Sequence, residues 1–122
     1  MIKKGFTLIE SLVVITMMMV IVAIAVTSYA SAGKKNRDNR RMADLERIRT
    51  ALELFRQEDL GGSYPAVSGG KALNLNPDYI DVWPIGPKGG TDTYIYSRPS
   101  AYSYIVNTTL ETTGVGYSVA NP

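Results

Sequence analysis

A nearly continuous apolar run over residues 6–32 is the feature that most restricts how this chain can fold. Leu, Val, Ile, Met and Ala make up most of the run, and Glu10 is its only charged side chain. A helix of about 20 apolar residues is long enough to cross the hydrocarbon core of a bilayer. A charged side chain costs about 2.5 to 3.5 kcal/mol at the centre of a membrane helix on insertion scales, and less near the interface. Glu10 therefore calls for a functional explanation, and we expect its partner to be a cation.

The residues before Glu10 form a specific pattern. Lys3 and Lys4 precede Gly5, Phe6 follows it, and Glu10 is the fifth residue of a chain that starts at Phe6. This pattern resembles the processing signal of type IV pilins and of the pseudopilins of type II secretion and DNA-uptake systems. The resemblance implies that a membrane-embedded prepilin peptidase cuts after Gly5 and methylates the new amine of Phe6. An i, i+4 spacing would place Phe6 and Glu10 on one helical face, so the carboxylate could meet its own terminal amine or that of a neighbouring subunit.

Two simpler interpretations of the apolar run stand beside this one. An ordinary secretory signal would end at a small-residue site, for which residues 28–30 or 31–33 could be mistaken, but its apolar stretch has only about 7 to 15 residues. The second simpler interpretation is a plain membrane anchor.

The basic residues on the two sides of the apolar run conflict with the processing motif about membrane orientation. Five of them follow the run, and a simple count of both flanks favours the orientation opposite to the one that the motif implies; they are Lys34, Lys35, Arg37, Arg40 and Arg41. We favour the processing motif because it is the more specific signal.

Residues 36–59 contain no Gly or Pro and carry apolar residues at steps of three and four, which indicates an amphipathic helix. The apolar stripe consists of Met42, Leu45, Ile48, Leu52 and Phe55. The predicted solvent-facing side carries Arg41, Asp44, Arg47, Glu53 and Glu58. Asp44 and Glu46 are spaced to pair with nearby arginines. A second stretch of the chain also resembles pseudopilins. The resemblance rests on an Asp-Leu at residues 44–45, an aromatic residue at 55 and a Tyr-Pro at 64–65.

We predict one helix over residues 7–60, half in lipid and half outside it. Gly33 is its one weak point and a possible bend, because Gly costs about 1 kcal/mol relative to Ala in a helix. Gly61 and Gly62 should end the helix, since Gly tolerates the left-handed conformation of a helix C-terminus. Pro65 should prevent its resumption.

The composition changes from residue 63 onward, where Tyr, Gly, Pro, Ser and Thr become frequent and helical periodicity disappears. We expect a loop over residues 67–77. Alternating and β-branched residues predict strands at 93–97, 101–106 and 115–119. An antiparallel meander laid across the apolar stripe would give each element a partner, so the predicted fold class is α+β, a long N-terminal helix packed by a small antiparallel β-sheet head.

Alternating tyrosines in the predicted strands allow two interpretations. Tyr94, Tyr96, Tyr102 and Tyr104 could form an adhesive aromatic patch, or they could pack against one another across the strands. We favour packing.

Cysteine and histidine are both absent, which excludes the usual zinc sites and catalysis by Ser-His or Cys-His pairs. The net charge of +2 does not by itself indicate nucleic-acid binding. Residues 86–90 lack the Gly-Lys-Ser/Thr ending of a phosphate loop. The acidic residues of the head are too scattered to predict a calcium site; they are Asp78, Asp81, Asp92 and Glu111. We predict no metal, no cofactor and no enzymatic activity.

The expected organisation is a cleaved cytoplasmic leader (1–5), a transmembrane and polymerisation helix (6–33), an amphipathic helix half (34–60) and a head (61–122). The resemblance implies a structural subunit of a type IV pilus or a type II secretion-like pseudopilus, held as a single-pass protein in the inner membrane and then assembled into an extracellular or periplasmic filament. Its implied partners are identical or related pilin subunits, the prepilin peptidase, and an assembly ATPase with its platform protein. The alternative is a membrane-anchored small binding domain with the helix as a simple tether.

The middle of the apolar run departs from the family it resembles. Pilins usually carry a Gly and a Pro there, and the segment between them tends to lose helical structure in filaments. The matching positions here are Met19 and Thr27, and neither residue breaks a helix. We therefore predict that residues 7–32 stay helical in both monomer and filament.

Overall fold

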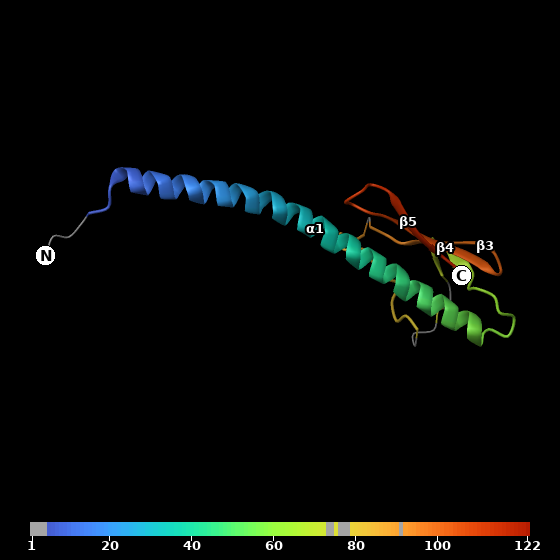
Figure 1. Cartoon of the computed structure of the whole chain (residues 1–122). Helices are drawn as coiled ribbons and strands as arrows, with labels where there is room; N and C mark the ends of the chain where they lie inside the picture. Colours follow the sequence, from blue (N-terminus) through green and yellow to red (C-terminus); the bar gives the residue numbers. More distant parts are fainter. Residues whose placement is uncertain (1–4, 73–74, 76–78, 91) are drawn as a thin grey trace. The chain divides into compact units, whose positions relative to one another are not determined.

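The computed structural model describes residues 5–72, 75, 79–90 and 92–122. Its first element is helix α1, Leu8–Glu58 (Figure 1). The prediction of one long helix is confirmed, with ends that differ from the expected ones by one or two residues, and α1 continues through Gly33 without a break. Lys3 and Lys4 of the predicted leader lie outside the described residues. The chain divides into two compact units, an N-terminal unit of residues 1–34 and a C-terminal unit of residues 35–122.

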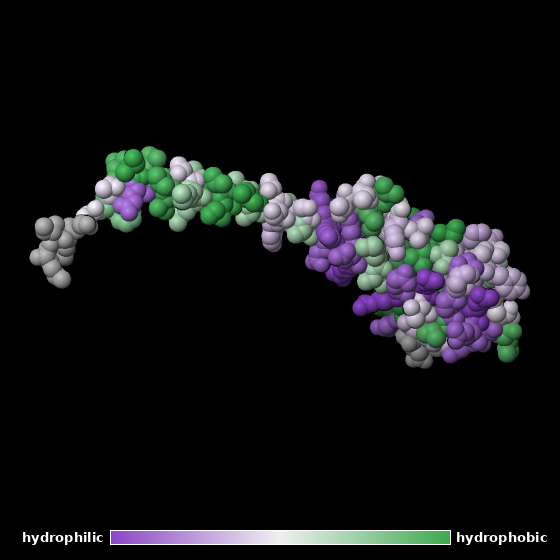
Figure 2. Space-filling view, viewed as in Figure 1, coloured by the Kyte–Doolittle hydropathy of each residue, from purple (hydrophilic) through white to green (hydrophobic). Residues whose placement is uncertain are grey.

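The apolar side chains of the N-terminal unit are exposed along the helix, and Figure 2 shows this stretch as mostly hydrophobic, with a few polar residues between the apolar ones. Even the least exposed of its large apolar residues, Val14, keeps 41% of its surface accessible. The hydroxyls of Thr16 and Thr27 donate to carbonyls one turn earlier at 2.8 and 3.0 Å, so the helix itself satisfies them. The helix has the length and composition to cross a membrane. Because burying apolar surface is favourable, this unit needs lipid or other apolar helices around it.

The C-terminal unit joins the second part of α1 to two small antiparallel sheets. One is a two-stranded hairpin of β1 (Val67–Ser68) and β2 (Lys71–Ala72). The other has the order β3-β4-β5, with β3 at Ile95–Ser100, β4 at Ser103–Thr109 and β5 at Gly116–Ala120 (Figure 1). The α+β fold class is therefore confirmed.

The three predicted strands exist, but each begins one or two residues later and ends one to three residues later than expected. The prediction of an unstructured loop over residues 67–77 was wrong where β1 and β2 pair, although part of that range lies outside the described residues. Gly69 and Gly70 make this hairpin possible, because both have positive φ angles, 55° and 76°. Two adjacent glycines between short runs are a hairpin signal in the sequence.

The core lies between α1 and the inner face of the three-stranded sheet. Leu45, Ile48 and Leu52 of the predicted stripe are fully buried there, whereas Met42 and Phe55 at its ends are only half-buried. The sheet and the segment after the helix contribute Tyr64, Tyr94, Tyr96, Tyr104, Val106 and Val119. Burial of several aromatic side chains supplies a large apolar area to a small unit.

Three of the four alternating tyrosines are buried, and the packing interpretation is confirmed for Tyr96 and Tyr104. The rings of Tyr96 on β3 and Tyr104 on β4 lie 6.2 Å apart, and Tyr104 also meets Tyr64 edge-on at 4.6 Å. Tyr102 is 62% exposed, so it cannot form an adhesive patch with the other three.

The predicted solvent-facing side of α1 was partly wrong. Arg47 and Glu58 are exposed as expected, but Arg41 and Asp44 are buried and Glu53 is half-buried. Position 41 continues the stripe of positions 45, 48 and 52 by one more turn, so its side chain is carried under the sheet in spite of its charge.

Asp44 and Glu53 find tyrosine partners there. Asp44 was expected to pair with an arginine, and instead its carboxylate accepts a hydrogen bond of 2.8 Å from the hydroxyl of Tyr94. Glu53 accepts hydrogen bonds from the hydroxyls of Tyr64 and Tyr104 at 2.9 and 3.2 Å. The Glu46 pairing was correct, with Arg49 at 3.7 Å. Tyrosine hydroxyls therefore let acidic residues approach the core.

Candidate functional site

Thr7 fixes where the helix begins. Its carbonyl accepts hydrogen bonds from the backbone N–H groups of Glu10 and Ser11 at 3.1 and 3.2 Å, and its hydroxyl accepts a longer one of 3.4 Å from the N–H of Glu10. A Thr followed three residues later by Glu is the pattern of a capping box, in which the cap side chain satisfies a backbone donor of the first turn. Sequence reasoning missed this role of Thr7, although the spacing was visible.

The predicted processing residues lie just before this cap. Gly5 and Phe6 precede α1, so the expectation that Phe6 and Glu10 share a helical face does not hold in the uncut chain. Phe6 is 74% exposed, and a Cβ added at Gly5 would meet no atom within 4 Å. The peptide bond between them is therefore in accessible, non-helical backbone, and nothing in the described chain requires a glycine at position 5.

Glu10 occupies the first turn of α1 and is exposed, with apolar side chains before and after it along the run. A carboxylate in the first turn interacts favourably with the helix dipole, typically by about 0.3 to 1 kcal/mol. That is less than the cost of placing a charge deep in lipid. Within the described residues, Glu10 has no basic side chain at ion-pair distance. The interaction with the helix dipole therefore explains only part of the presence of Glu10.

A second group of charged residues, which we call the Arg41 cluster, lies in the C-terminal unit and consists of Arg37, Asp38, Arg41, Lys88, Asp92 and Glu111. Arg41 is at its centre with only 2% of its side chain exposed. It contacts Asp38 at 2.8 Å, Asp92 at 2.6 Å and Glu111 at 2.7 Å. Three cations face three carboxylates, so the cluster is neutral overall.

The remaining contacts of this cluster pin two loops to the helix. Both carboxylate oxygens of Glu111 also accept hydrogen bonds from the guanidinium of Arg37, each at 2.9 Å. The ammonium of Lys88 forms an ion pair with Glu111 at 2.9 Å. Asp38 accepts the backbone N–H groups of Glu111 and Thr112, each at 2.8 Å, and the hydroxyl of Thr112 at 2.5 Å. The loop between β4 and β5 is thus held against the first turns of α1 in the C-terminal unit.

These contacts shift the pKa values of the carboxyl groups. Burial alone would raise the pKa of Asp38, but the hydrogen bonds from Thr112, the backbone of Glu111 and Arg41 outweigh it and lower the pKa to about 2. The hydrogen bonds from Arg37 and Lys88 hold the pKa of Glu111 well below its usual range. Both groups stay ionised at neutral pH, which keeps the cluster fully charged.

The expectation that the acidic residues of the head are scattered was therefore wrong for two of them. Arg41 gathers Asp92 and Glu111, which stand 51 and 70 residues after it in the sequence. Asp81 is exposed and lies outside this cluster, and Asp78 lies outside the described residues. Among the described residues, no group of three or more metal-ligating side chains is placed to hold a metal ion.

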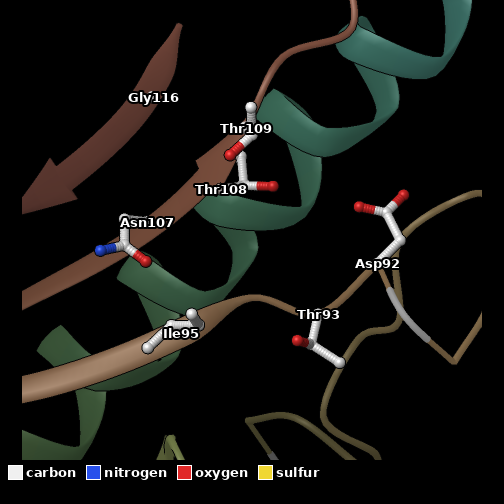
Figure 3. Close-up of a pocket in the computed structure, with 7 residues that line it drawn as sticks. All are labelled: Asp92, Thr93, Ile95, Asn107, Thr108, Thr109 and Gly116. Atoms are coloured by element: carbon white, nitrogen blue, oxygen red, sulfur yellow. The ribbon is translucent and has the colours of Figure 1, made fainter. Parts of the chain in front are cut away.

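A cavity of about 480 Å³ lies beside the cluster and is lined by Asp92, Thr93, Ile95, Asn107, Thr108, Thr109 and Gly116 (Figure 3). Among the described residues that line it, Asp92 is the only ionisable one, and its carboxylate is bonded to Arg41. The other lining groups are hydroxyls, one amide and one aliphatic side chain, none of which is paired with a general base. The cavity therefore presents no arrangement for nucleophilic or acid–base catalysis.

Comparison with family models places a specific motif at the N-terminus. Residues 1–26 match the prokaryotic N-terminal methylation motif. Comparisons with curated proteins and with solved structures found no match. The matched segment contains Gly5, Phe6 and Glu10 and most of the apolar helix. Residues 1–26 therefore carry the class III processing signal of type IV pilins and pseudopilins, and the exposed apolar part of the helix fits a membrane anchor.

Proposed function

We propose that this chain is a structural subunit of a type IV pilus or a type II secretion-like pseudopilus that polymerises through α1. The observation that carries this proposal is the exposed apolar part of α1, which lies largely within the methylation motif and has one carboxylate in its first turn. Such a surface is stable in lipid and equally stable against other apolar helices. The same helix can therefore serve a membrane-stored monomer and the core of a filament.

Processing takes place between Gly5 and Phe6. A prepilin peptidase cuts after Gly5 and methylates the amine of Phe6, and residues 1–5 are the leader that it removes. The accessible, non-helical backbone before the Thr7 cap supports this assignment, because a protease binds its substrate in an extended form. The demand for glycine at position 5 then comes from the peptidase, since the chain itself leaves room for a larger side chain there.

Assembly depends on Glu10. A carboxylate that faces only apolar groups in a filament core is costly, whereas one that faces an amine is compensated. Glu10 pairs with the methylated amine of Phe6 of a neighbouring subunit, which selects the register of the helices. The partners are identical or related pilin subunits, the peptidase, and an assembly ATPase with its platform protein. The chain itself is a building block, not an enzyme.

The mass of the mature chain from native membranes tests this proposal. We expect a chain that starts at Phe6 and carries one methyl group on its amine. Gly5→Trp should abolish the cut while leaving the helix content unchanged by circular dichroism, because a Cβ at position 5 would meet no atom of the described residues within 4 Å. A native chain that keeps Met1 would contradict the proposal and favour the alternative of a membrane-tethered binding domain.

A further inference from the structure

The structure separates the basic residues after the apolar run into two groups. Arg37 and Arg41 are committed to carboxylates in the Arg41 cluster. Lys35 and Arg40 are exposed, and among the described residues neither has an ion-pair or hydrogen-bond partner. A simple count of charges in the sequence treats all of these residues alike. Among the described residues, Lys35 and Arg40, together with Lys34 at the end of the N-terminal unit, remain available to a partner outside the chain.

The position of these two residues indicates what that partner is. Lys35 and Arg40 lie on α1 directly after the segment that has the composition of a membrane span. Basic residues next to a membrane span attract anionic lipid headgroups, and this attraction falls off within a Debye length, about 8 Å at physiological ionic strength. The internal cluster is neutral and cannot repel a headgroup, so the field along this part of the helix is set by the exposed cations Lys34, Lys35 and Arg40.

We propose that Lys35 and Arg40 bind the headgroups of anionic phospholipids and so form a lipid-binding surface on the C-terminal unit. This inference rests on the membrane placement of the apolar helix in the proposed function. It adds a lipid class to that function: the stored monomer is surrounded by phosphatidylglycerol-type lipids, not by zwitterionic ones. Lys35 and Arg40 have long, flexible side chains, so their charged ends can follow lipid phosphates that move. A rigid site could not do this, because the phosphates of a fluid bilayer hold no fixed positions.

Lipid recovered with the protein tests this proposal. The full-length chain is reconstituted into vesicles of phosphatidylcholine and phosphatidylglycerol and extracted with mild detergent, and the ratio of the two lipids that remain bound is measured by mass spectrometry. We expect enrichment of phosphatidylglycerol that decreases in high salt. The double variant Lys35→Gln, Arg40→Gln should reduce the enrichment by about fivefold for each residue replaced.

Arg47→Gln is the matched control. Arg47 is equally exposed and unpaired among the described residues, but it stands about 18 Å beyond Lys35 along the helix at about 1.5 Å per residue, more than two Debye lengths away. Its replacement should leave the enrichment unchanged. Unchanged enrichment in the double variant, or an equal loss in the control, would overturn the proposal.

Two further outcomes separate this inference from the proposed function. If the chain inserts into vesicles of phosphatidylcholine alone but shows no preference for phosphatidylglycerol, the lipid-binding surface is refuted and the membrane anchor stands. If the chain does not insert into either vesicle, both are refuted. Loss of filaments in the double variant with full lipid enrichment would assign Lys35 and Arg40 to a protein partner and would also overturn the lipid assignment.

Discussion

Arg41 on α1 and Asp92 on the loop before β3 stand 51 residues apart in the chain and form an ion pair of 2.6 Å. Asp92 is in turn held by its surroundings, because its backbone carbonyl accepts the N–H of Gly86 at 2.8 Å and its own N–H donates to the carbonyl of Gly89 at 2.7 Å. A Cβ at position 86 would clash with the carboxyl group of Asp92. Gly86 thus allows the close approach that presents Asp92 to Arg41. The pair joins the helix to the sheet by a contact that no local pattern contains.

Removing this arginine should destabilise the C-terminal unit strongly. Arg41→Met leaves Asp38, Asp92 and Glu111 without their common cation, and breaking a buried ion pair by removing one partner costs about 3 to 5 kcal/mol. Urea unfolding of the full chain in detergent measures the change through the fluorescence of Trp83, whose ring N–H donates to the carbonyl of Tyr94.

The control for this prediction is Arg47→Met, at an exposed position of the same helix. Surface changes of this kind usually stay within about 0.5 kcal/mol. Equal destabilisation by the two variants would show that the cluster around Arg41 contributes no more than a solvated charge.

Acid should weaken the C-terminal unit as the pH falls from about 4 to about 2. The pKa of Asp38 is about 2 in the folded chain, against an ordinary value of 3.8. Because the folded pKa is the lower one, the stability that this carboxylate contributes is complete above the unfolded value and is lost as the pH falls through the folded value. The lowered pKa of Glu111 acts in the same direction.

Unfolding midpoints at a series of pH values, again from Trp83 fluorescence, check this prediction. Asp38→Asn should be less stable at neutral pH and should lose less stability between pH 4 and pH 2 than the unchanged chain. Asp81→Asn, at an exposed position, should keep the original acid dependence. An Asp38→Asn variant with the same acid dependence as the unchanged chain would contradict the assignment.

Two roles are proposed for Glu10, pairing with an amine in the filament and support of the helix start, and two variants distinguish them. Glu10→Ala should leave membrane insertion intact or slightly improved and should prevent normal filament assembly. Glu10→Gln keeps a residue that suits the third position of a capping box, but removes the charge. We expect both variants to lose filaments, counted by electron microscopy of cells that make only the variant.

A Ser11→Ala variant is the control, because it changes the neighbouring polar residue without changing the charge. If Glu10→Gln assembled normally, capping of the helix and not pairing with an amine would be the role of Glu10. Normal filaments from Glu10→Ala would refute both roles in assembly.

The N-terminal half of α1 should remain helical in the filament. In the monomer the helix passes through Met19 and Thr27 without interruption, as the absence of Gly and Pro at these positions predicted. A proline in a helix interior costs about 3 kcal/mol, so Thr27→Pro should create the local melting that this sequence lacks. Cryo-electron microscopy of filaments checks both statements. Extended backbone between residues 19 and 27 in the unchanged filament would show that packing, not local sequence, controls melting.

The sequence by itself determined the elements that depend on local patterns. The apolar run and the periodicity of residues 36–59 predicted one helix, because helix geometry brings positions three and four apart onto one face whatever the rest of the chain does. The strands of the three-stranded sheet followed from alternation and β-branched residues, and the processing motif from adjacent residues. The role of Thr7 could also have been predicted from the local pattern, since a Thr three residues before a Glu indicates a capping box.

Only the tertiary structure decided which charges are buried and which face solvent. The helical pattern placed Arg41 on the edge of the apolar stripe, but its charge suggested solvent, and no local rule supplied Asp92 and Glu111 as its partners. A buried cation is stable only if carboxylates reach it, and here they arrive on loops that the sheet topology brings back to the helix. Lys35 and Arg40 are exposed for the complementary reason: they lie next to the same cluster in the sequence, but no carboxylate of the described residues pairs with them.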